Sequence, residues 1–202
     1  MTEHTGAKTR EDILRAAIKA LARSNYAEIS MQDIASASGI TKPTIYYYFA
    51  SKKGLFVALA SYITGKIRGV IEEETGSSRS LRDSLVRIAG RILDSPITSP
   101  DFARVHLAFS TDPSLKALVP TLKSDFEGIH SLLVEHLKRA RSRGEVRDDA
   151  DVELVGRIFV SVLHTYLAMR IEGGPGDARE PGARQIVEVL MRGVTCDPGG
   201  ES

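Results

Sequence analysis

Apolar residues recur at the spacing of an α-helix along most of this chain of 202 residues, and no other feature constrains the fold as strongly. Near the N-terminus, Leu14, Ala17, Ile18 and Leu21 occupy positions i, i+3, i+4 and i+7. No segment alternates convincingly between apolar and polar residues, as a half-buried β-strand does. The sequence therefore predicts an all-α protein of about nine helices, with a three-helix head at the N-terminus and a larger helical body.

Short sequence signals predict where the helices begin and end. Thr9 with Asp12, and Ser30 with Asp33, resemble the capping box that starts a helix. Gly39 fits the left-handed position that ends a helix. Later helices are expected over residues 51–74, 80–93, 102–109, 122–143, 152–171 and 183–194, separated by segments rich in Pro, Gly, Ser or charged residues.

Residues 30–49 have the layout of a helix-turn-helix, with a short helix, a tight turn that holds a glycine, and a second helix capped by Thr41. On a helical wheel, Ile45, Tyr48 and Phe49 cluster on one side of the second helix. A helix this short is unstable alone in water, so these three side chains must dock it against its neighbours. The remaining side chains then form a presented face that is aromatic, methyl-bearing and basic: Lys42, Pro43, Thr44, Tyr46 and Tyr47.

The presented face has two interpretations. It fits the major groove of double-stranded DNA, where hydroxyl and ammonium groups suit phosphate oxygens and the Pro43 ring suits a thymine methyl. The charge distribution supports this, because residues 8–53 hold eight Lys or Arg against four Asp or Glu, a net +4 in a chain of net +1. Alternatively, Tyr46 and Tyr47 pack against a neighbouring domain.

A longer stretch around this motif resembles a known family. The segment YAEISMQDIASASGITKPTIYYYFASKKGLFVAL, residues 26–59, is similar to the N-terminal signature of the TetR family of bacterial transcriptional regulators. It covers about a quarter of the chain, whereas the rest is similar to the family only in length and helical character. The closest matches are Ile34, Ala35, Gly39, Tyr46, Phe49, Lys52 and Leu55.

The resemblance implies a role for each matching position. Ser30 and Gln32 would meet the DNA backbone and a base edge, and Lys52 would bind a phosphate. The recognition surface would consist of Thr41, Lys42, Pro43, Thr44, Tyr46 and Tyr47, with Tyr48 ranked lower because its position varies in the family. The resemblance also implies a helix-turn-helix DNA-binding domain over residues 1–53 and a helical ligand-binding and dimerisation domain over residues 54–202.

The expected helix over residues 152–171 is apolar nearly all round, which is typical of a helix that packs on two sides. Its first face holds Val152, Val155, Ile158, Phe159, Val162, Leu163, Tyr166 and Leu167. A second, small-sided strip holds Ser161, His164, Thr165 and Ala168, and the last helix has a stripe of Ala183, Ile186, Val187 and Leu190. Two such helices from each of two chains would form a four-helix homodimer interface, as the resemblance also implies. Alternatively, both helices belong to the core of one monomer.

The body is larger than a dimerisation element requires, which favours a small, largely apolar effector molecule as a partner. We expect its pocket among the helices of the body. The candidate pocket residues are Tyr62, Phe102, His106, Phe109, Phe126, His130, Phe159 and Tyr166, each of which could instead be an ordinary core residue.

Other classes of function lack support in the sequence. It contains no Gly-x-Ser-x-Gly, phosphate-binding loop, Rossmann fingerprint or His-Glu-x-x-His, so we expect no enzyme. The histidines lack metal-ligand spacing, so we expect no metal and no cofactor, and a hydrogen-bonded histidine is favoured over a metal ligand at each of positions 106, 130, 136 and 164. With a polar opening segment, no bilayer-length apolar stretch and Cys196 as the single cysteine, the chain is expected to be cytoplasmic and to have no membrane partner.

The resulting hypothesis is a ligand-responsive repressor that binds a pseudo-palindromic operator in double-stranded DNA as a homodimer and is released by a small molecule. The alternatives are an activator or a ligand-independent regulator of the same fold, or a helical adaptor that docks another protein on its aromatic face.

Overall fold

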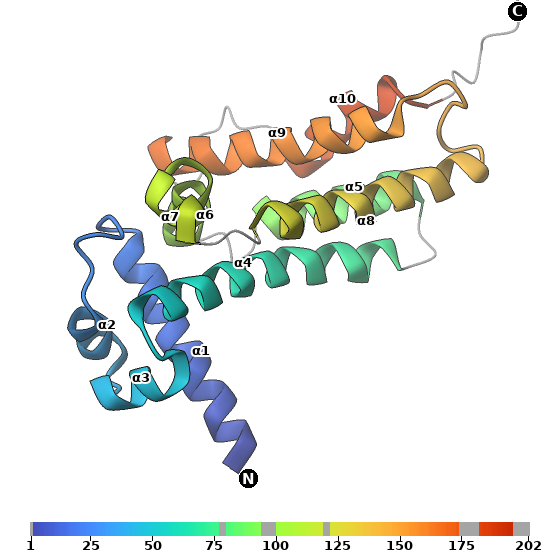
Figure 1. The fold of residues 1–202 in the computed structure, drawn as a ribbon. Coiled ribbons are helices and arrows are strands. Elements are labelled where there is room, and N and C mark those ends of the chain that lie inside the picture. The colour runs from blue at the N-terminus through green and yellow to red at the C-terminus, as the bar shows by residue number, and fades with distance from the viewer. Residues whose placement is uncertain (1, 77–79, 94–99, 119–121, 174–181, 196–202) are drawn as a thin grey trace, which may run out of the picture. The chain divides into compact units, whose positions relative to one another are not determined.

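A computed structural model describes residues 2–76, 80–93, 100–118, 122–173 and 182–195 (Figure 1), and within these ranges the ordered elements are all helices. The predicted all-α class is confirmed. The elements are α1 (Thr2–Leu21), α2 (Met31–Ser38), α3 (Lys42–Phe49), α4 (Lys52–Thr75), α5 (Leu81–Leu93), α6 (Pro100–Thr111), α7 (Pro113–Leu118), α8 (Leu122–Ser142), α9 (Val152–Gly173) and α10 (Ala183–Arg192).

The chain divides into two compact units. The first unit comprises Met1–Gly65 and Ser99–Lys123, and the second comprises Lys66–Thr98 and Ser124–Ser202. The boundary therefore falls within α4, whose first part belongs to the first unit and whose last part belongs to the second. The predicted division into domains at residues 53 and 54 stays a prediction.

Local capping explains why most helices start where the sequence indicates. The Ser30 hydroxyl accepts the Asp33 N–H at 3.1 Å while the Asp33 carboxylate accepts the Ser30 N–H at 2.8 Å, which completes the predicted capping box of α2. Gly39 ends α2 with φ of 69°, as predicted. The Thr41 hydroxyl caps α3, and the Ser51 hydroxyl accepts the Gly54 N–H at 2.9 Å at the start of α4.

One helix start and one additional helix differ from the expectation. The first helix begins at Thr2 rather than at Thr9, because residues 2–8 include good helix formers and no proline. In addition, α7 lies in a segment where no helix was expected. At its start the Asp112 carboxylate accepts the Ser114 N–H at 2.7 Å. This single capping residue did not predict a helix, because the residues around it have the composition of a loop.

The core of the first unit joins the first four helices. α1 packs against α2 and α6, and α2 packs against α3. The ring of Phe56 on α4 is fully buried and meets the Tyr26 ring edge-on, with 4.9 Å between centroids. The fully buried aliphatic side chains of this core are Ile13, Leu14, Ala17, Ile34, Ile45, Leu55 and Leu59. Their burial holds the two helices of the predicted helix-turn-helix in place.

The second unit has a separate core. α10 packs against α5 and α9, and α5 packs against α9. The amphipathic stripe of α5 is nearly completely buried, and α8 contributes a row of buried residues at helical spacing. The buried apolar residues of these two helices are Leu81, Leu85, Ile88, Ala89, Ile92, Leu93, Ile129, Leu133, Val134, Leu137 and Ala140.

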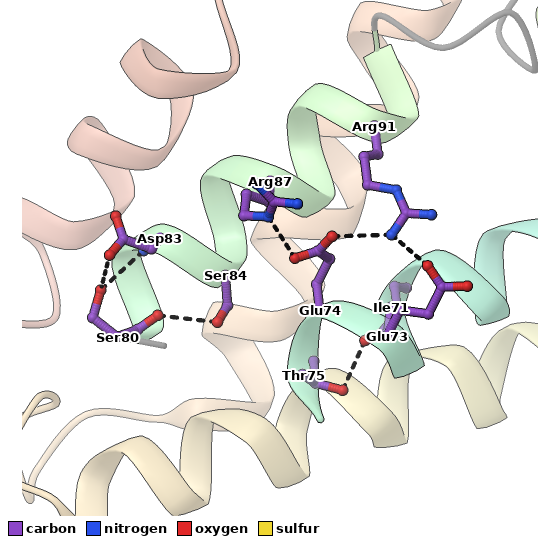
Figure 2. A network of polar contacts seen from close by, with 9 residues as sticks. All are labelled: Ile71, Glu73, Glu74, Thr75, Ser80, Asp83, Ser84, Arg87 and Arg91. Carbon is purple, nitrogen blue, oxygen red and sulfur yellow. Dashed lines mark hydrogen bonds and ion pairs between the residues drawn. The ribbon is translucent and has the colours of Figure 1, made fainter. Parts of the chain in front are cut away.

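A polar network ties the end of α4 to α5 inside the second unit (Figure 2). Glu74 is only 3% exposed, and its carboxylate accepts hydrogen bonds from Arg87 Nε at 2.7 Å and Arg91 Nη1 at 3.0 Å. Arg91 also pairs with Glu73 at 2.7 Å. Because a buried carboxylate without these partners would cost several kcal/mol, roughly 3–5, the network holds the last turn of α4 against α5.

α4 is long and apolar enough to cross a membrane by length and composition alone. In this structure its apolar side chains pack inside the protein: Leu55, Leu59 and Ile63 are buried in the first unit, and Val70 and Ile71 are buried in the second. α4 is therefore a core helix shared by both units.

Candidate nucleic-acid interface

α3 is docked by one face and exposes the other. Ile45 is fully buried and Phe49 is 6% exposed, whereas Tyr46 is 41% exposed and Tyr47 is 84% exposed. A tyrosine as exposed as Tyr47 places a large apolar ring in water, which is unusual unless a partner covers it. Thr41, Lys42 and Pro43 are also exposed, and Thr44 is half-buried. All six residues predicted for the recognition surface therefore lie at or near one accessible face.

Tyr48 lies between the two faces of α3. Its ring meets the Tyr47 ring edge-on at 5.4 Å and the Phe49 ring at 6.3 Å. Its hydroxyl reaches α1, where a Cβ built on Gly6 would lie 3.4 Å from it. Tyr48 is half-buried rather than a full core residue, and it supports the exposed Tyr47 from the side.

The start of α2 holds two of the predicted contact residues. Gln32 is exposed and makes its amide accessible. Ser30 is also exposed, but its hydroxyl donates to the Asp33 carboxylate at 2.7 Å. These hydrogen bonds to Ser30 are the main reason that the pKa of Asp33 lies below its ordinary value. A contact from Ser30 to DNA would compete with its role as the cap of α2.

The Lys52 ammonium already makes two contacts within the protein. Its ammonium lies 4.4 Å from the centroid of the Tyr26 ring and donates to the Ala27 carbonyl at 3.3 Å. Burial lowers the pKa of Lys52 from its ordinary value. An ammonium has three donors, so the remaining two can still face a phosphate from a fixed position. The neighbouring Lys53 is exposed to solvent.

The predicted pocket residues are dispersed over the two units. Tyr62 and Phe109 belong to the first unit, where Phe109 is buried and the Tyr62 hydroxyl donates to Glu11 on α1 at 2.9 Å. Burial, followed by this hydrogen bond, raises the pKa of Tyr62 to about 12. Tyr62 thus ties α4 to α1. The side chains of Phe102 and His106 lie outside the described part of the chain.

The remaining candidates lie in the second unit. Phe126 and His130 are half-buried on α8, and His130 Nε2 lies 3.2 Å from the Glu153 carbonyl oxygen at the start of α9. Phe159 and Tyr166 line a groove formed by α9 and α10. Phe159 and Tyr166 are therefore two predicted pocket residues that the described part of the chain brings together at one cavity.

The groove has a volume of about 770 Å³ and is bounded mainly by apolar side chains. Ile158 is 43% exposed, Leu154 52% and Val189 75%, so the groove lies on an apolar surface that faces solvent. The apolar side chains along it are Leu154, Val155, Ile158, Phe159, Val162, Ile186, Val189 and Leu190.

The predicted dimer residues fall on this surface only in part. Ser161 and Thr165 are exposed on α9, and Ile186 and Leu190 line the groove. Val187 is fully buried, so it belongs to the core of the second unit rather than to an accessible interface. His164 is half-buried, and the side chain of Ala168 lies outside the described residues.

Sequence reasoning placed Ile158 on the core face of α9 and missed the exposure of Leu154 and Val189. A helix that is apolar nearly all round has no polar face to show which side is outward. The sequence signal that could have indicated this outward side is the i, i+4 spacing of Leu154 and Ile158, which places both residues on the same stripe of α9.

His136 was expected to be hydrogen-bonded, and this expectation was wrong. It is 2% exposed, and neither ring nitrogen has a hydrogen-bond partner among the described residues. Burial, assisted by the nearby Arg139 and Arg143 charges, lowers the pKa of His136 to about 4. Its ring is therefore a neutral core group at pH 7.

Comparisons with known proteins agree with this geometry. A family model for bacterial regulatory proteins of the tetR family matches residues 13–59. The transcriptional repressor LfrR of Mycolicibacterium smegmatis is 26% identical over 188 residues, which is 93% of this chain and 89% of the relative.

Two solved structures have the same fold. A TetR family transcription regulator from Marinobacter aquaeolei VT8 has a TM-score of 0.74 at 17% identity, over 96% of this chain and 98% of the other. The regulator FadR from Bacillus subtilis, solved in complex with stearoyl-CoA, has a TM-score of 0.68 at 15% identity, over 90% and 95%. Residues 13–59 therefore match the tetR family of bacterial regulatory proteins, and the chain as a whole is similar to a transcriptional repressor and has the fold of solved TetR-family regulators.

Proposed function

We propose that this protein is a repressor that binds a pseudo-palindromic operator as a homodimer and releases it when a small, largely apolar molecule binds. The observation that carries the proposal is the exposed face of α3, where Tyr47 is 84% exposed beside an exposed lysine and proline. A helix with side chains is about 10–12 Å wide, which fits a major groove about 12 Å wide.

Each exposed side chain of this face has a suitable partner on DNA. In the proposal, Lys42 and the hydroxyls of Thr41, Tyr46 and Tyr47 bind phosphates or base edges. Pro43 and the Thr44 methyl contact thymine methyl groups. At the rim, Gln32 approaches a base edge, while Ser30 and Lys52 meet the backbone.

A second copy of the chain is the proposed occupant of the α9/α10 groove. Leu154, Ile158 and Val189 expose apolar surface along it, and exposed apolar patches of this kind are typical of interfaces between subunits. Two heads related by a two-fold axis would read half-sites about 34 Å, or a multiple of that, apart. Reading two half-sites explains how a protein with so short a recognition helix could select one operator.

The proposed effector acts through α4. This helix begins beside the predicted DNA contacts and ends at the buried Glu74 network in the second unit. A ligand that favours a different tilt of α4 would misplace the heads. A preference of about 1–3 kcal/mol would weaken DNA binding about 5–150-fold. The stearoyl-CoA in the FadR complex supports an effector with a long apolar part.

The proposal keeps the division into a DNA-binding domain over residues 1–53 and a ligand-binding and dimerisation domain over residues 54–202, in a cytoplasmic, non-enzymatic protein. An activator or a ligand-independent regulator of the same fold remains the alternative, because the surfaces described are common to all three. A protein-docking adaptor would use the same aromatic face without any dependence on DNA.

The test is binding to a DNA fragment that flanks the protein's own gene. Tyr47→Ala and Lys42→Ala should each weaken binding, and Lys42→Ala should lower the slope of log affinity against log salt by about one unit. Circular dichroism would verify that both variants keep their helical content. Unchanged DNA affinity in both folded variants would show that the α3 face has another partner. The same conclusion would follow if this protein bound another protein but no DNA duplex.

A further inference from the structure

We propose that the N-terminal turns of α1 form a second DNA contact, in which Arg10 binds a backbone phosphate beside the bases that α3 faces. The proposal rests on the proposed function of α3. It adds an element that lies outside the family signature noted in the sequence, which starts at residue 26. The two helices belong to the same compact unit, so their relative placement is part of the described structure.

The first observation is that α1 and the C-terminal end of α3 touch at two successive turns. A Cβ on Gly6 would lie 3.4 Å from the Tyr48 hydroxyl, and the Arg10 guanidinium carbon lies 5.4 Å from the centroid of the Phe49 ring. Gly6 and Arg10 are four residues apart, so both lie on the face of α1 that meets α3. Figure 1 shows the first turns of α1 continuing past the end of α3.

The second observation is the state of the Arg10 side chain. It is exposed, and among the described residues it has no carboxylate partner, whereas Arg15, one turn later, pairs with Glu11 at 2.9 Å. Its guanidinium is instead held over the Phe49 ring, which fixes the direction of the charge without neutralising it. A planar guanidinium held in this way can bind the oxygens of a phosphate through two parallel hydrogen bonds.

Groove dimensions then identify the partner of Arg10 as backbone rather than base. A docked α3 fills the width of the major groove, because the helix and the groove are both about 12 Å across. An element packed against the end of α3 must therefore lie over the groove edge, where the phosphates run. A contact there contributes affinity that is independent of sequence and depends on salt.

The test compares Arg10→Met with the unmodified protein on operator and on unrelated duplexes. The methionine keeps an apolar stem against Phe49 and removes the charge. We expect the slope of log affinity against log salt to fall by about one unit on both duplexes, with the preference for operator unchanged. Arg10→Lys should retain most of the slope. Lys19→Met is the matched control, because Lys19 is an exposed α1 residue about 14 Å further along the axis.

Phosphate ethylation gives an independent measurement. Ethylation of one phosphate beside each half-site should lower the DNA affinity of the unmodified protein and leave the DNA affinity of Arg10→Met unchanged. An unchanged salt slope together with unchanged ethylation sensitivity in a folded Arg10→Met variant would overturn the inference. If Tyr47→Ala still abolishes operator preference in that case, the proposed function stands without it. If the unmodified protein binds no duplex, both proposals fall.

Discussion

His136 illustrates how a single buried residue can make the stability of a helical unit depend on pH. It lies on α8 with 2% of its surface exposed, near Arg139 on the same helix and near Arg143 and Glu145 in the following turn. Its pKa is about 4 in the folded protein, against an ordinary value of 6.5. Between these two pH values the unfolded chain binds a proton that the folded chain does not. The resulting contribution to stability is present above pH 6.5 and is lost as the pH falls toward 4.

We predict that His136→Leu removes this pH dependence. The unmodified protein should lose about 2–3 kcal/mol of unfolding free energy from this residue between pH 7 and pH 4, and the variant should not. At pH 7.5 the variant should be at least as stable, because it no longer buries two unpaired ring nitrogens. Urea unfolding at pH 7.5, 6 and 5 measures the difference. Parallel losses in both proteins would assign the acid sensitivity to other groups.

Single residues also show what the sequence can and cannot reveal. The outward direction of Tyr46 and Tyr47 was predictable, because the docking of a short helix leaves only one face free. The contacts of Lys52 with Tyr26 and of Tyr62 with Glu11 were not, because they join residues distant in sequence. Capping residues act on neighbours three positions away, whereas these contacts depend on how helices pack.

At the scale of elements, the corner between α3 and α4 is the tightest feature of the head. A Cβ on Gly54 would lie 2.1 Å from the Phe49 carbonyl oxygen, so the first turn of α4 approaches the end of α3 more closely than any other residue type allows. Ala50, between the two helices, has a positive φ of 59°. The corner therefore fixes the angle between α3 and the first turn of α4.

We predict opposite effects for two glycine substitutions within α4. Gly54→Ala should lower the free energy of unfolding, because its new methyl group meets a backbone oxygen that cannot move away alone. Gly65→Ala should raise it by about 0.5–1 kcal/mol, because no described atom lies within 4 Å of the new methyl group and alanine favours the helix. Thermal unfolding of both variants supplies the comparison. Equal effects would mean that the corner adapts to a side chain.

Elements differ in how well periodicity predicts them. α2 and α3 have caps at both ends and a clear apolar face, so sequence reasoning placed them correctly. α9 is apolar nearly all round, so its outward stripe of Leu154 and Ile158 could be assigned only from the fold. α7 is too short for periodicity to register at all.

For the whole molecule, the proposed dimer makes a direct prediction. Ile158→Glu should place a carboxylate in the middle of the α9/α10 surface and shift the protein toward monomers, because an unpaired charge is costly to bury. Analytical ultracentrifugation would detect the change. Arg157→Glu is the control, since Arg157 is exposed on α9 outside the groove. Dimers of normal stability in Ile158→Glu would exclude this surface as the interface.

The proposed control by an effector is testable by thermal shift. An apolar molecule that binds the folded protein at 100 times its Kd should stabilise it by about 2.7 kcal/mol and should release operator DNA. Tyr47→Ala should show the same thermal shift, because Tyr47 is exposed on the proposed DNA-binding face of α3 and does not line the groove. A screen of fatty acyl compounds and other apolar metabolites that finds no such molecule would favour the ligand-independent alternative.

The division of the chain into two units has a spectroscopic consequence. The chain contains no tryptophan and six tyrosines, and five of them, at positions 26, 46, 47, 48 and 62, belong to the first unit. Ultraviolet-excited emission from the unlabelled protein therefore originates mainly in the first unit, with Tyr166 as the sole tyrosine of the second unit. Circular dichroism, in contrast, sums over the helices of both units. Melting curves recorded by the two signals on one sample would separate if the first unit unfolds independently of the second. They would coincide if the two units, which share α4, unfold as one cooperative system.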